Sequence, residues 1–306
     1  MTDNLNGFLK DNNTSLIGCW ITLAHPAIAE IMAKAGFDWL AIDMEHSVIT
    51  IREAEELIRV IDLAGVVPLV RLTSNNPDQI KRIMDAGAHG IIVPMVNSAK
   101  DAINAVEAIK YPPMGKRGIG LARAQGYGKQ FQEYFDWEKA GSTVIVQVEH
   151  IDAVNNLEEI FSVDGVDGYI IGPYDLTGSM GIPGQFEHPD FLSAMEKIQL
   201  VADKMNMTGG IHVIEAEPDQ LKQRVEEGFR FIAYSLDVRM LDAAIKKGFN
   251  ESGGVVDSNK SVEKGKTVDS KYSNAKYVGL VYTTLTDYYS DAVYTGYVNK
   301  LGKPYG

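Results

Sequence analysis

The chain of 306 residues has one cysteine, only 11 prolines and no excess of positive charge. A single cysteine, Cys19, excludes an internal disulfide, and its place in an apolar segment predicts a buried small hydrophobic residue rather than a nucleophile. The formal net charge of -12 argues against nucleic acid as a partner, because binding phosphates requires a basic surface.

The sequence also lacks a long apolar run. No stretch approaches the roughly 18 apolar residues that a membrane-spanning helix requires. Residues 1–6 are polar and carry no charged-then-apolar leader. From these absences we expect a cytoplasmic protein without a membrane partner.

What the chain does contain is a regular alternation of short apolar runs and segments with helical spacing. Strands that are apolar on both faces and alternate with helices indicate a parallel sheet covered by helices. Eight such runs favour a closed (β/α)8 barrel over an open doubly wound sheet. The expected strands are 17–22, 39–44, 66–72, 90–95, 143–149, 168–173, 209–213 and 231–236.

Two segments depart from this alternation. Residues 111–140 form a long insertion, which we expect at the catalytic face as a substrate lid or a contact with a neighbouring subunit. Within it, Arg123 or Lys129 is a candidate to meet a distal carboxylate of a substrate. We assign 1–249 to the barrel and 250–306 to a polar linker and a tyrosine-rich C-terminal arm across a subunit interface.

Polar side chains gather where the expected strands end, which in a barrel is the catalytic end. Glu149 closes the fifth strand, and Asp175 follows the sixth. A carboxylate at the end of a buried strand is costly unless something binds it, and Mg²⁺ or Mn²⁺ prefers carboxylate oxygens. Ion pairs with arginine or lysine are the alternative to the shared metal site that we predict.

Three further residues at strand ends are candidates for catalysis. Arg71 would stabilise a developing oxyanion or, alternatively, serve as a structural partner of a carboxylate. His46 stands three residues after Asp43, a spacing that lets the carboxylate orient the imidazole as a base, although a structural role is the alternative. The other five histidines are weaker candidates, and His212 falls within the seventh expected strand.

Two other kinds of chemistry have little support in the sequence. The segment from Gly118 to Gly120 lacks the preceding strand and the following acidic residue of a dinucleotide site. Lys81 and Lys100 fall on expected helices, so neither is placed as a Schiff-base lysine. We therefore expect no organic cofactor, and any carbonyl chemistry would use the metal.

Five motifs occur in order between residues 15 and 249. They are IDMEHS at 42–47, PLVR at 68–71, DAGAHGIIVPMV at 85–96, QVE at 147–149 and IGPYDLTGSMG at 171–181. Together they resemble the motifs of the HpcH/HpaI family of class II pyruvate aldolases, which includes 4-hydroxy-2-oxoheptanedioate and 2-dehydro-3-deoxyglucarate aldolases. The resemblance implies an α/β fold, a (β/α)8 TIM barrel of the phosphoenolpyruvate/pyruvate type with a C-terminal extension, and a homo-oligomer that is a hexamer or is built from dimers.

The resemblance also implies roles for individual residues. Glu149 and Asp175 would hold Mg²⁺ or Mn²⁺, with Co²⁺ and Zn²⁺ as alternatives, and pyruvate would chelate the ion. Arg71 would stabilise the enolate oxygen. The pair of His46 and Asp43 would remove the proton of the C4 hydroxyl as the C3–C4 bond breaks.

The implied reaction is the reversible, metal-dependent retro-aldol cleavage of a 4-hydroxy-2-oxo acid into pyruvate and an aldehyde. The substrate would be a diacid or a 2-keto-3-deoxy sugar acid, met in the breakdown of aromatic compounds or carbohydrate acids. Many relatives have a small residue where Tyr174 stands. This position is expected where the aldehyde half of the substrate binds, so Tyr174 bears on which aldehyde the enzyme accepts. The residues expected around the substrate are Trp20, Gln147, Gly172, Pro173 and Tyr174.

Two other functions remain open from the sequence. One is a related metal-dependent lyase that cleaves another carbon–carbon bond or a thioester on the same barrel. The other is a non-catalytic assembly protein that uses the C-terminal arm as its interaction surface. Retention of Arg71, His46, Glu149 and Asp175 argues against the second.

Overall fold

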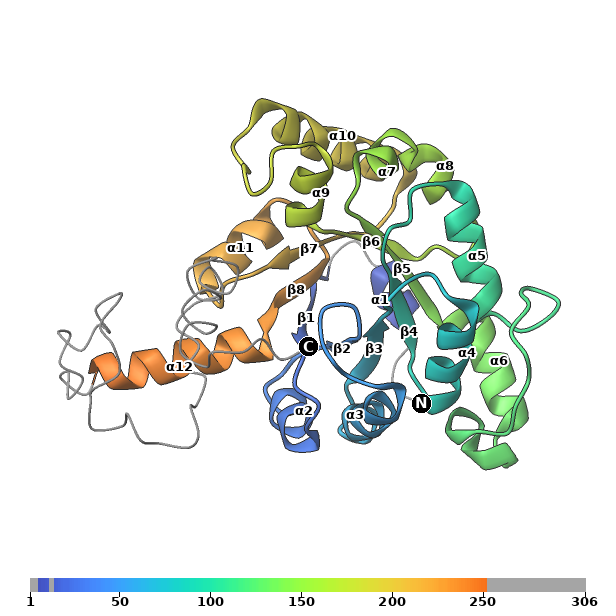
Figure 1. Ribbon diagram of the computed structural model, residues 1–306. Coiled ribbons are helices and arrows are strands. Elements are labelled where there is room, and N and C mark those ends of the chain that lie inside the picture. Colours follow the sequence, from blue (N-terminus) through green and yellow to red (C-terminus); the bar gives the residue numbers. More distant parts are fainter. Residues whose placement is uncertain (1–4, 11–13, 252–306) are drawn as a thin grey trace, which may run out of the picture. The chain divides into compact units, whose positions relative to one another are not determined.

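The computed structural model describes residues 5–10 and 14–251, and Figure 1 shows them as a ring of strands surrounded by helices. Eight parallel strands close into one barrel in sequence order, from β1 beside β2 to β8 beside β1. Each strand lies within two residues of the bounds expected from the sequence, so the predicted (β/α)8 barrel is confirmed. The strands are β1 (Leu16–Ile21), β2 (Trp39–Asp43), β3 (Val67–Arg71), β4 (Gly90–Val93), β5 (Thr143–Val148), β6 (Gly168–Ile171), β7 (Gly209–Val213) and β8 (Phe231–Leu236).

Helices cover the outside of the barrel, and local sequence signals set their ends. The side chain of Thr50 and the Glu53 side chain cap each other's backbone at the start of α3, and proline occupies the first turn of α4. Gly87 ends α4 with φ of 102°, a left-handed conformation that lets the chain turn into β4. The helices are α1 (Leu5–Leu9), α2 (Pro26–Ala33), α3 (Ile51–Leu63), α4 (Pro77–Ala86), α5 (Ala99–Ile109), η1 (Arg123–Gly128), α6 (Phe131–Gly141), α7 (Ile151–Asn155), α8 (Leu157–Phe161), α9 (Pro173–Ser179), α10 (Pro189–Met205), α11 (Pro218–Glu226) and α12 (Asp237–Glu251).

The barrel has two apolar layers, because successive strand residues point to opposite faces. One layer packs between the strands and the surrounding helices and includes Cys19, buried as expected. The other fills the barrel, where the rings of Trp39 and Phe231 stack with centroids 4.2 Å apart. Leu5 and Leu9 of α1 belong to this inner layer, so the short amino-terminal helix closes one end of the barrel.

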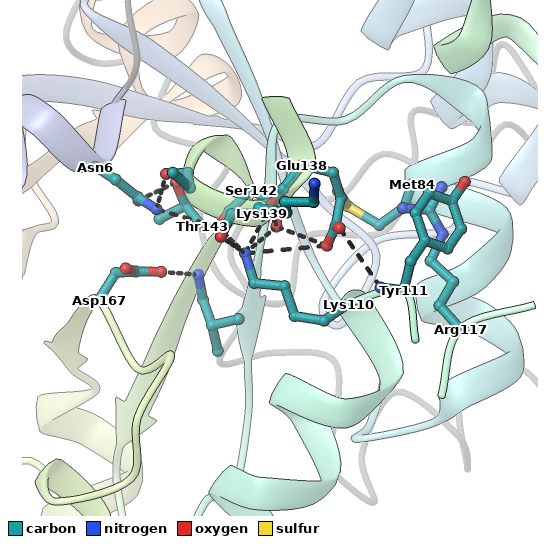
Figure 2. Close-up of polar contacts among 12 residues, drawn as sticks. Asn6, Met84, Lys110, Tyr111, Arg117, Glu138, Lys139, Ser142, Thr143 and Asp167 are labelled. Atoms are coloured by element: carbon teal, nitrogen blue, oxygen red, sulfur yellow. Dashed lines mark hydrogen bonds and ion pairs between the residues drawn. The ribbon is translucent and has the colours of Figure 1, made fainter. Parts of the chain in front are cut away.

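A buried polar network ties α1, α5 and α6 together near the start of β5 (Figure 2). The Lys110 ammonium donates to the Glu138 carbonyl at 2.8 Å and to the Ser142 hydroxyl at 2.7 Å. The Asn6 side chain donates to the Ser142 carbonyl at 3.1 Å and accepts from the Thr143 hydroxyl at 2.6 Å. These bonds give the buried ammonium the partners that its burial requires.

The insertion at 111–140 does not lie where the sequence suggested. It follows α5 and precedes β5, so it belongs to a helix-to-strand connection, and these connections lie at the end opposite the catalytic face. The Arg123 guanidinium donates to Asp62 at 2.5 Å and to the Ala86 carbonyl at 3.2 Å, at the carboxyl ends of α3 and α4. The expectation of a lid on this barrel's own catalytic face, with Arg123 meeting a distal carboxylate, is therefore wrong.

Helix α12 leaves the barrel rather than packing along it (Figure 1). Its exposed residues include Val238, Leu241 and Ile245, three apolar side chains on one face of the helix. The predicted linker and arm over 250–306 lie outside the described residues apart from the end of α12. Within the described ranges, none of the helices has the length and apolar character needed to cross a membrane.

Replacing Lys110 with methionine should lower the free energy of unfolding by about 3 kcal/mol, because the carbonyls and the Glu138 carboxylate around it would lose their buried donor. The measurement is urea denaturation followed by circular dichroism. Lys139→Met is the matched control, since the exposed Lys139 side chain should matter by less than about 0.5 kcal/mol. Equal effects of the two substitutions would contradict the structural role of this network.

Candidate active site

The polar residues of strands β2, β3, β5 and β6 and of the segments after them lie at the carboxyl end of the barrel. A cavity of about 60 Å³ opens there. Its lining includes seven of the residues expected around a substrate or metal: Trp20, Arg71, Gln147, Gly172, Pro173, Tyr174 and Asp175. His212 also lines this cavity.

Asp43 and Arg71 form a two-point ion pair at the ends of the paired strands β2 and β3. Arg71 Nε donates to Asp43 Oδ1 at 2.9 Å, and Nη2 donates to Oδ2 at 2.6 Å. Burial alone would raise the pKa of Asp43, but the hydrogen bonds and charge of Arg71 outweigh it and hold the pKa below its ordinary value. The same guanidinium lies 4.4 Å from the centroid of the Trp20 ring, so its orientation at the cavity is fixed from two sides.

His46 is placed differently from the expected pair with Asp43. Asp43 Oδ1 accepts the backbone N–H of His46 at 3.1 Å, and both carboxylate oxygens are engaged by Arg71. The imidazole is 60% exposed, and its Nε2 lies 3.7 Å from the Glu45 carboxylate. Asp43 therefore shapes the turn that carries His46, while Glu45 is the carboxylate beside the ring.

Glu149 is a buried carboxylate at the end of β5. Its Oε1 accepts the backbone N–H of Met95 at 2.6 Å, and its Oε2 accepts from the side-chain amide of Gln147. Burial, together with the nearby charges of Glu45 and Asp175, raises the pKa of Glu149 to about 7 despite these bonds. The carboxylate is therefore held in place but left short of positive charge.

The segment after β6 brings Asp175 to the same cavity. A Cβ on Gly172 would lie only 3.0 Å from Cβ of Glu149, so glycine permits the close approach of these two segments. Pro173 then starts α9, which places Asp175 in the first turn of that helix. Tyr174 is 55% exposed, and its ring meets Phe186 edge-on with centroids 4.9 Å apart.

The donor set fits a hard divalent cation. Burial and the charges of neighbouring carboxylates raise the pKa of both Glu45 and Glu149 to about 7, with Asp175 among the causes for each. Arg71 places one positive charge near these carboxylates, but its guanidinium is already paired with Asp43. Among the described residues, no three histidine, cysteine, aspartate or glutamate side chains are grouped to hold a metal alone. Two carboxylates would leave the other coordination positions to substrate and water.

Two residues beside Arg71 or in the cavity, Glu45 and His212, carried weaker sequence signals. Glu45 was visible as an acidic residue just after a strand, and its Oε2 lies 3.5 Å from Nη1 of Arg71. His212 was set aside as a strand residue, but strand alternation places it inside the barrel, because Ile211 and Val213 belong to the outer apolar layer. That alternation was the signal that could have found it.

Lys81 and Lys100 lie on α4 and α5, as expected.

Met95 holds Glu149 through an uncommon backbone conformation. Its φ of 53° lies in the left-handed region, which β-branched residues disfavour by roughly 1–2 kcal/mol. We expect Met95→Gly to keep Mn²⁺ affinity and Met95→Val to weaken it about 10-fold, because the valine backbone would draw the N–H away from Glu149. Titration calorimetry with Mn²⁺ measures this.

A matched control for this exchange is Met114→Val, at an exposed methionine outside the site whose φ is not positive. Its Mn²⁺ affinity should equal that of the unaltered protein. Wild-type affinity in Met95→Val as well would show that the Met95 backbone does not position Glu149.

Comparison with known proteins relates this barrel to a family of lyases. The sequence profile described as HpcH/HpaI aldolase/citrate lyase matches residues 16–244. A hydroxypyruvate/pyruvate aldolase from Roseobacter denitrificans is 38% identical over 242 residues, which cover 78% of this chain and 93% of that protein. A 4-hydroxy-2-oxo-heptane-1,7-dioate aldolase from Salmonella typhimurium is 38% identical over 227 residues, which cover 74% and 85% of the two chains.

A solved structure supports the same relationship. The crystal structure of an HpcH/HpaI aldolase/citrate lyase family protein from Burkholderia cenocepacia matches with a TM-score of 0.77 and 34% identity, covering 81% of this chain and 98% of that one. The chain belongs to the HpcH/HpaI aldolase/citrate lyase family and is an enzyme of the aldolase class.

Proposed function

We propose that the protein cleaves a 4-hydroxy-2-oxo acid reversibly into pyruvate and an aldehyde, with a divalent metal ion held by Glu149 and Asp175. The observation that carries this proposal is the buried Glu149 carboxylate, whose pKa is raised to about 7 by burial and by the charges of Glu45 and Asp175. The names of the relatives from Roseobacter and Salmonella support the reaction class.

The metal would contribute one part of the chemistry. When bound, Mg²⁺ or Mn²⁺ supplies Lewis-acid polarisation of the 2-oxo group of the substrate. Glu149 would be its buried ligand, oriented by the Met95 N–H and the Gln147 amide. Asp175 would be the ligand on the open side, where it is exposed at the first turn of α9.

The chain's own residues would bind the substrate and move a proton. Arg71, held by both oxygens of Asp43, is oriented to stabilise the negative charge that develops on the 2-oxo oxygen. The exposed imidazole of His46 would take the proton of the C4 hydroxyl, and the Glu45 carboxylate 3.7 Å away would stabilise the imidazolium that forms. The backbone N–H groups of Tyr174 and Asp175, in the first turn of α9, would bind the substrate carboxylate.

The aldehyde half would be a hydroxylated or carboxylated fragment, as in a diacid or a 2-keto-3-deoxy sugar acid. Because Arg123 is bound to Asp62 away from the cavity, it does not serve as a distal carboxylate partner within its own barrel. Tyr174 lines the cavity, so its ring would restrict the aldehyde half.

Removing either proposed metal ligand should abolish turnover. Glu149→Ala and Asp175→Ala should each lower metal-dependent pyruvate release by at least about 1,000-fold, because the remaining carboxylate cannot hold the ion alone. The assay couples pyruvate release from a panel of 4-hydroxy-2-oxo acids to lactate dehydrogenase, with Mn²⁺ or Mg²⁺ and then with EDTA. Glu159→Ala, at an exposed acid on α8, is the matched control. Pyruvate release that persists in EDTA would rule out the metal-dependent reaction.

We further propose that the enzyme self-associates through α12. Leu241 and Ile245 are 50% and 49% exposed on one face of a helix that leaves its own barrel (Figure 1). Exposed apolar stripes of this kind mark contact surfaces in soluble proteins. A second copy of the chain is the occupant to which we commit, in a hexamer or another assembly built from dimers.

The double substitution Leu241→Lys and Ile245→Lys should reduce the mass of the assembly, because two charges would have to be buried at the contact. Size-exclusion chromatography with light scattering measures the mass. Ala243→Lys is the matched control, since Ala243 is exposed and lies on the opposite face of α12. An unchanged mass in the double variant, or a monomeric unaltered protein, would overturn the proposal.

A further inference from the structure

A groove of about 590 Å³ lies between α10 and α11, on the outer side of β7. Ile211 and Val213 of β7 line it, and both side chains belong to the apolar layer outside the strands. Met195 lines it from α10 and Arg224 from α11. The groove therefore lies where a helix of the barrel would ordinarily pack on its strand.

Helix α11 leaves this space open because it packs loosely on the barrel. None of its residues 218–226 is buried, whereas α10 buries Phe191, Ala194, Ile198 and Ala202. An amphipathic helix is stabilised mainly by burying one of its faces. The groove beside α11 is therefore a gap that an apolar group would fill favourably.

The groove adjoins the active-site cavity. Four residues line both spaces, namely Pro173, Tyr174, His212 and Ile214. The cavity measures about 60 Å³, and one water molecule needs about 10–15 Å³ of such volume, so the cavity holds only a few heavy atoms. A three-carbon acid such as pyruvate suits that space, and any longer group joined to the acid extends beyond it.

The bond that the reaction makes places the aldehyde at the edge of this cavity. In the direction of synthesis, the aldehyde carbon bonds to C3 of pyruvate and becomes C4 of the product, while the aldehyde oxygen takes up a proton and becomes the C4 hydroxyl. A chain attached to this carbon therefore begins where the cavity ends. Tyr174 and Ile214, which line both spaces, are the residues past which the chain would enter the groove.

The lining of the groove favours an uncharged, apolar chain. Phe186, Leu192 and Phe229 add to its apolar surface. Among the described residues, the acidic and basic side chains that line it are Glu187, Glu196, Glu215, Arg224 and Glu227. The Arg224 guanidinium lies 2.6 Å from the Glu227 carboxylate, so its charge is already paired. The remaining negative charge disfavours a carboxylate in the groove, whereas each buried methylene group is favourable.

We propose that the groove between α10 and α11 binds the apolar chain of an aldehyde, so that the enzyme uses aliphatic aldehydes such as hexanal better than short ones such as acetaldehyde. This assignment rests on the proposed aldolase function. It extends the aldehyde half from hydroxylated and carboxylated fragments to alkyl chains.

The test compares aldehydes of increasing chain length with one donor. With Mn²⁺ and pyruvate, kcat/KM is measured for acetaldehyde, butanal and hexanal by chromatography of the products. Each methylene group that enters the groove should raise kcat/KM about threefold, because its burial stabilises the bound aldehyde. The value for hexanal should therefore exceed that for acetaldehyde by about 10-fold or more.

Matched double substitutions on α10 separate the groove from the rest of the helix. Leu192→Gln with Met195→Gln places polar groups in the groove, so the ratio of kcat/KM for hexanal to that for acetaldehyde should fall about 10-fold. Leu200→Gln with Met205→Gln makes the same exchanges outside the groove, again at an exposed leucine and a half-buried methionine, and should leave the ratio unchanged. Equal losses for both aldehydes in the groove variant, or an unchanged ratio, would overturn the proposal.

A second copy of the chain is the other group that would cover an apolar groove. In that case the groove variant would lower the mass of the assembly in size-exclusion chromatography with light scattering, and hexanal would gain nothing over acetaldehyde. These two results together would assign the groove to a subunit contact and overturn the proposal.

Equilibrium binding of an unreactive chain distinguishes failure of this inference from failure of the proposed function. In calorimetric titration, the Mn²⁺-loaded enzyme should bind 1-hexanol at least about 10-fold more tightly than ethanol, and the groove variant should lose this difference. That preference without turnover of any aldehyde would contradict the aldolase reaction while retaining the groove as a site for apolar chains. Equal binding of both alcohols to the unaltered enzyme would overturn the groove site.

Discussion

Burying a carboxylate at the mouth of a closed barrel is costly, and the surroundings of Glu149 follow from that cost. Parallel strands leave it at the end of β5, where water is largely excluded and its exposed fraction is 2%. The Met95 N–H and the Gln147 amide hold the carboxylate but do not neutralise it. With Glu45 and Asp175 nearby, the site lacks positive charge, and a hard divalent cation is the group that would supply it.

Barrel closure brings the candidate catalytic residues together around this carboxylate. Pairing of β2 with β3 sets Asp43 beside Arg71, and pairing of β5 with β6 brings Glu149 close to Gly172 and the first turn of α9. At the opposite end, α1 packs into the barrel, and the Lys110 ammonium finds its hydrogen-bond partners within the protein itself. Stability and chemistry are thus placed at different ends of the same strands.

The sequence predicted the strands and the residues at their carboxyl ends because apolar runs and strand-end polar residues are local patterns. It misplaced the insertion at 111–140, because an insertion between two strands lies at either end depending on which side of the intervening helix it follows. It also paired His46 with Asp43. In the structure, Arg71 on the neighbouring strand binds both oxygens of the Asp43 carboxylate, a bidentate geometry that an imidazole cannot form. The groove between α10 and α11 depends on how distant elements pack, which no spacing along the chain reveals.

The most direct test of the metal site is an anomalous difference map from a crystal grown with Mn²⁺ and pyruvate. We expect one Mn²⁺ peak within coordination distance of the carboxylates of both Glu149 and Asp175, with pyruvate bound to the ion and Arg71 facing its 2-oxo oxygen. Pyruvate bound in the cavity without such a peak, or a peak that neither carboxylate contacts, would contradict it.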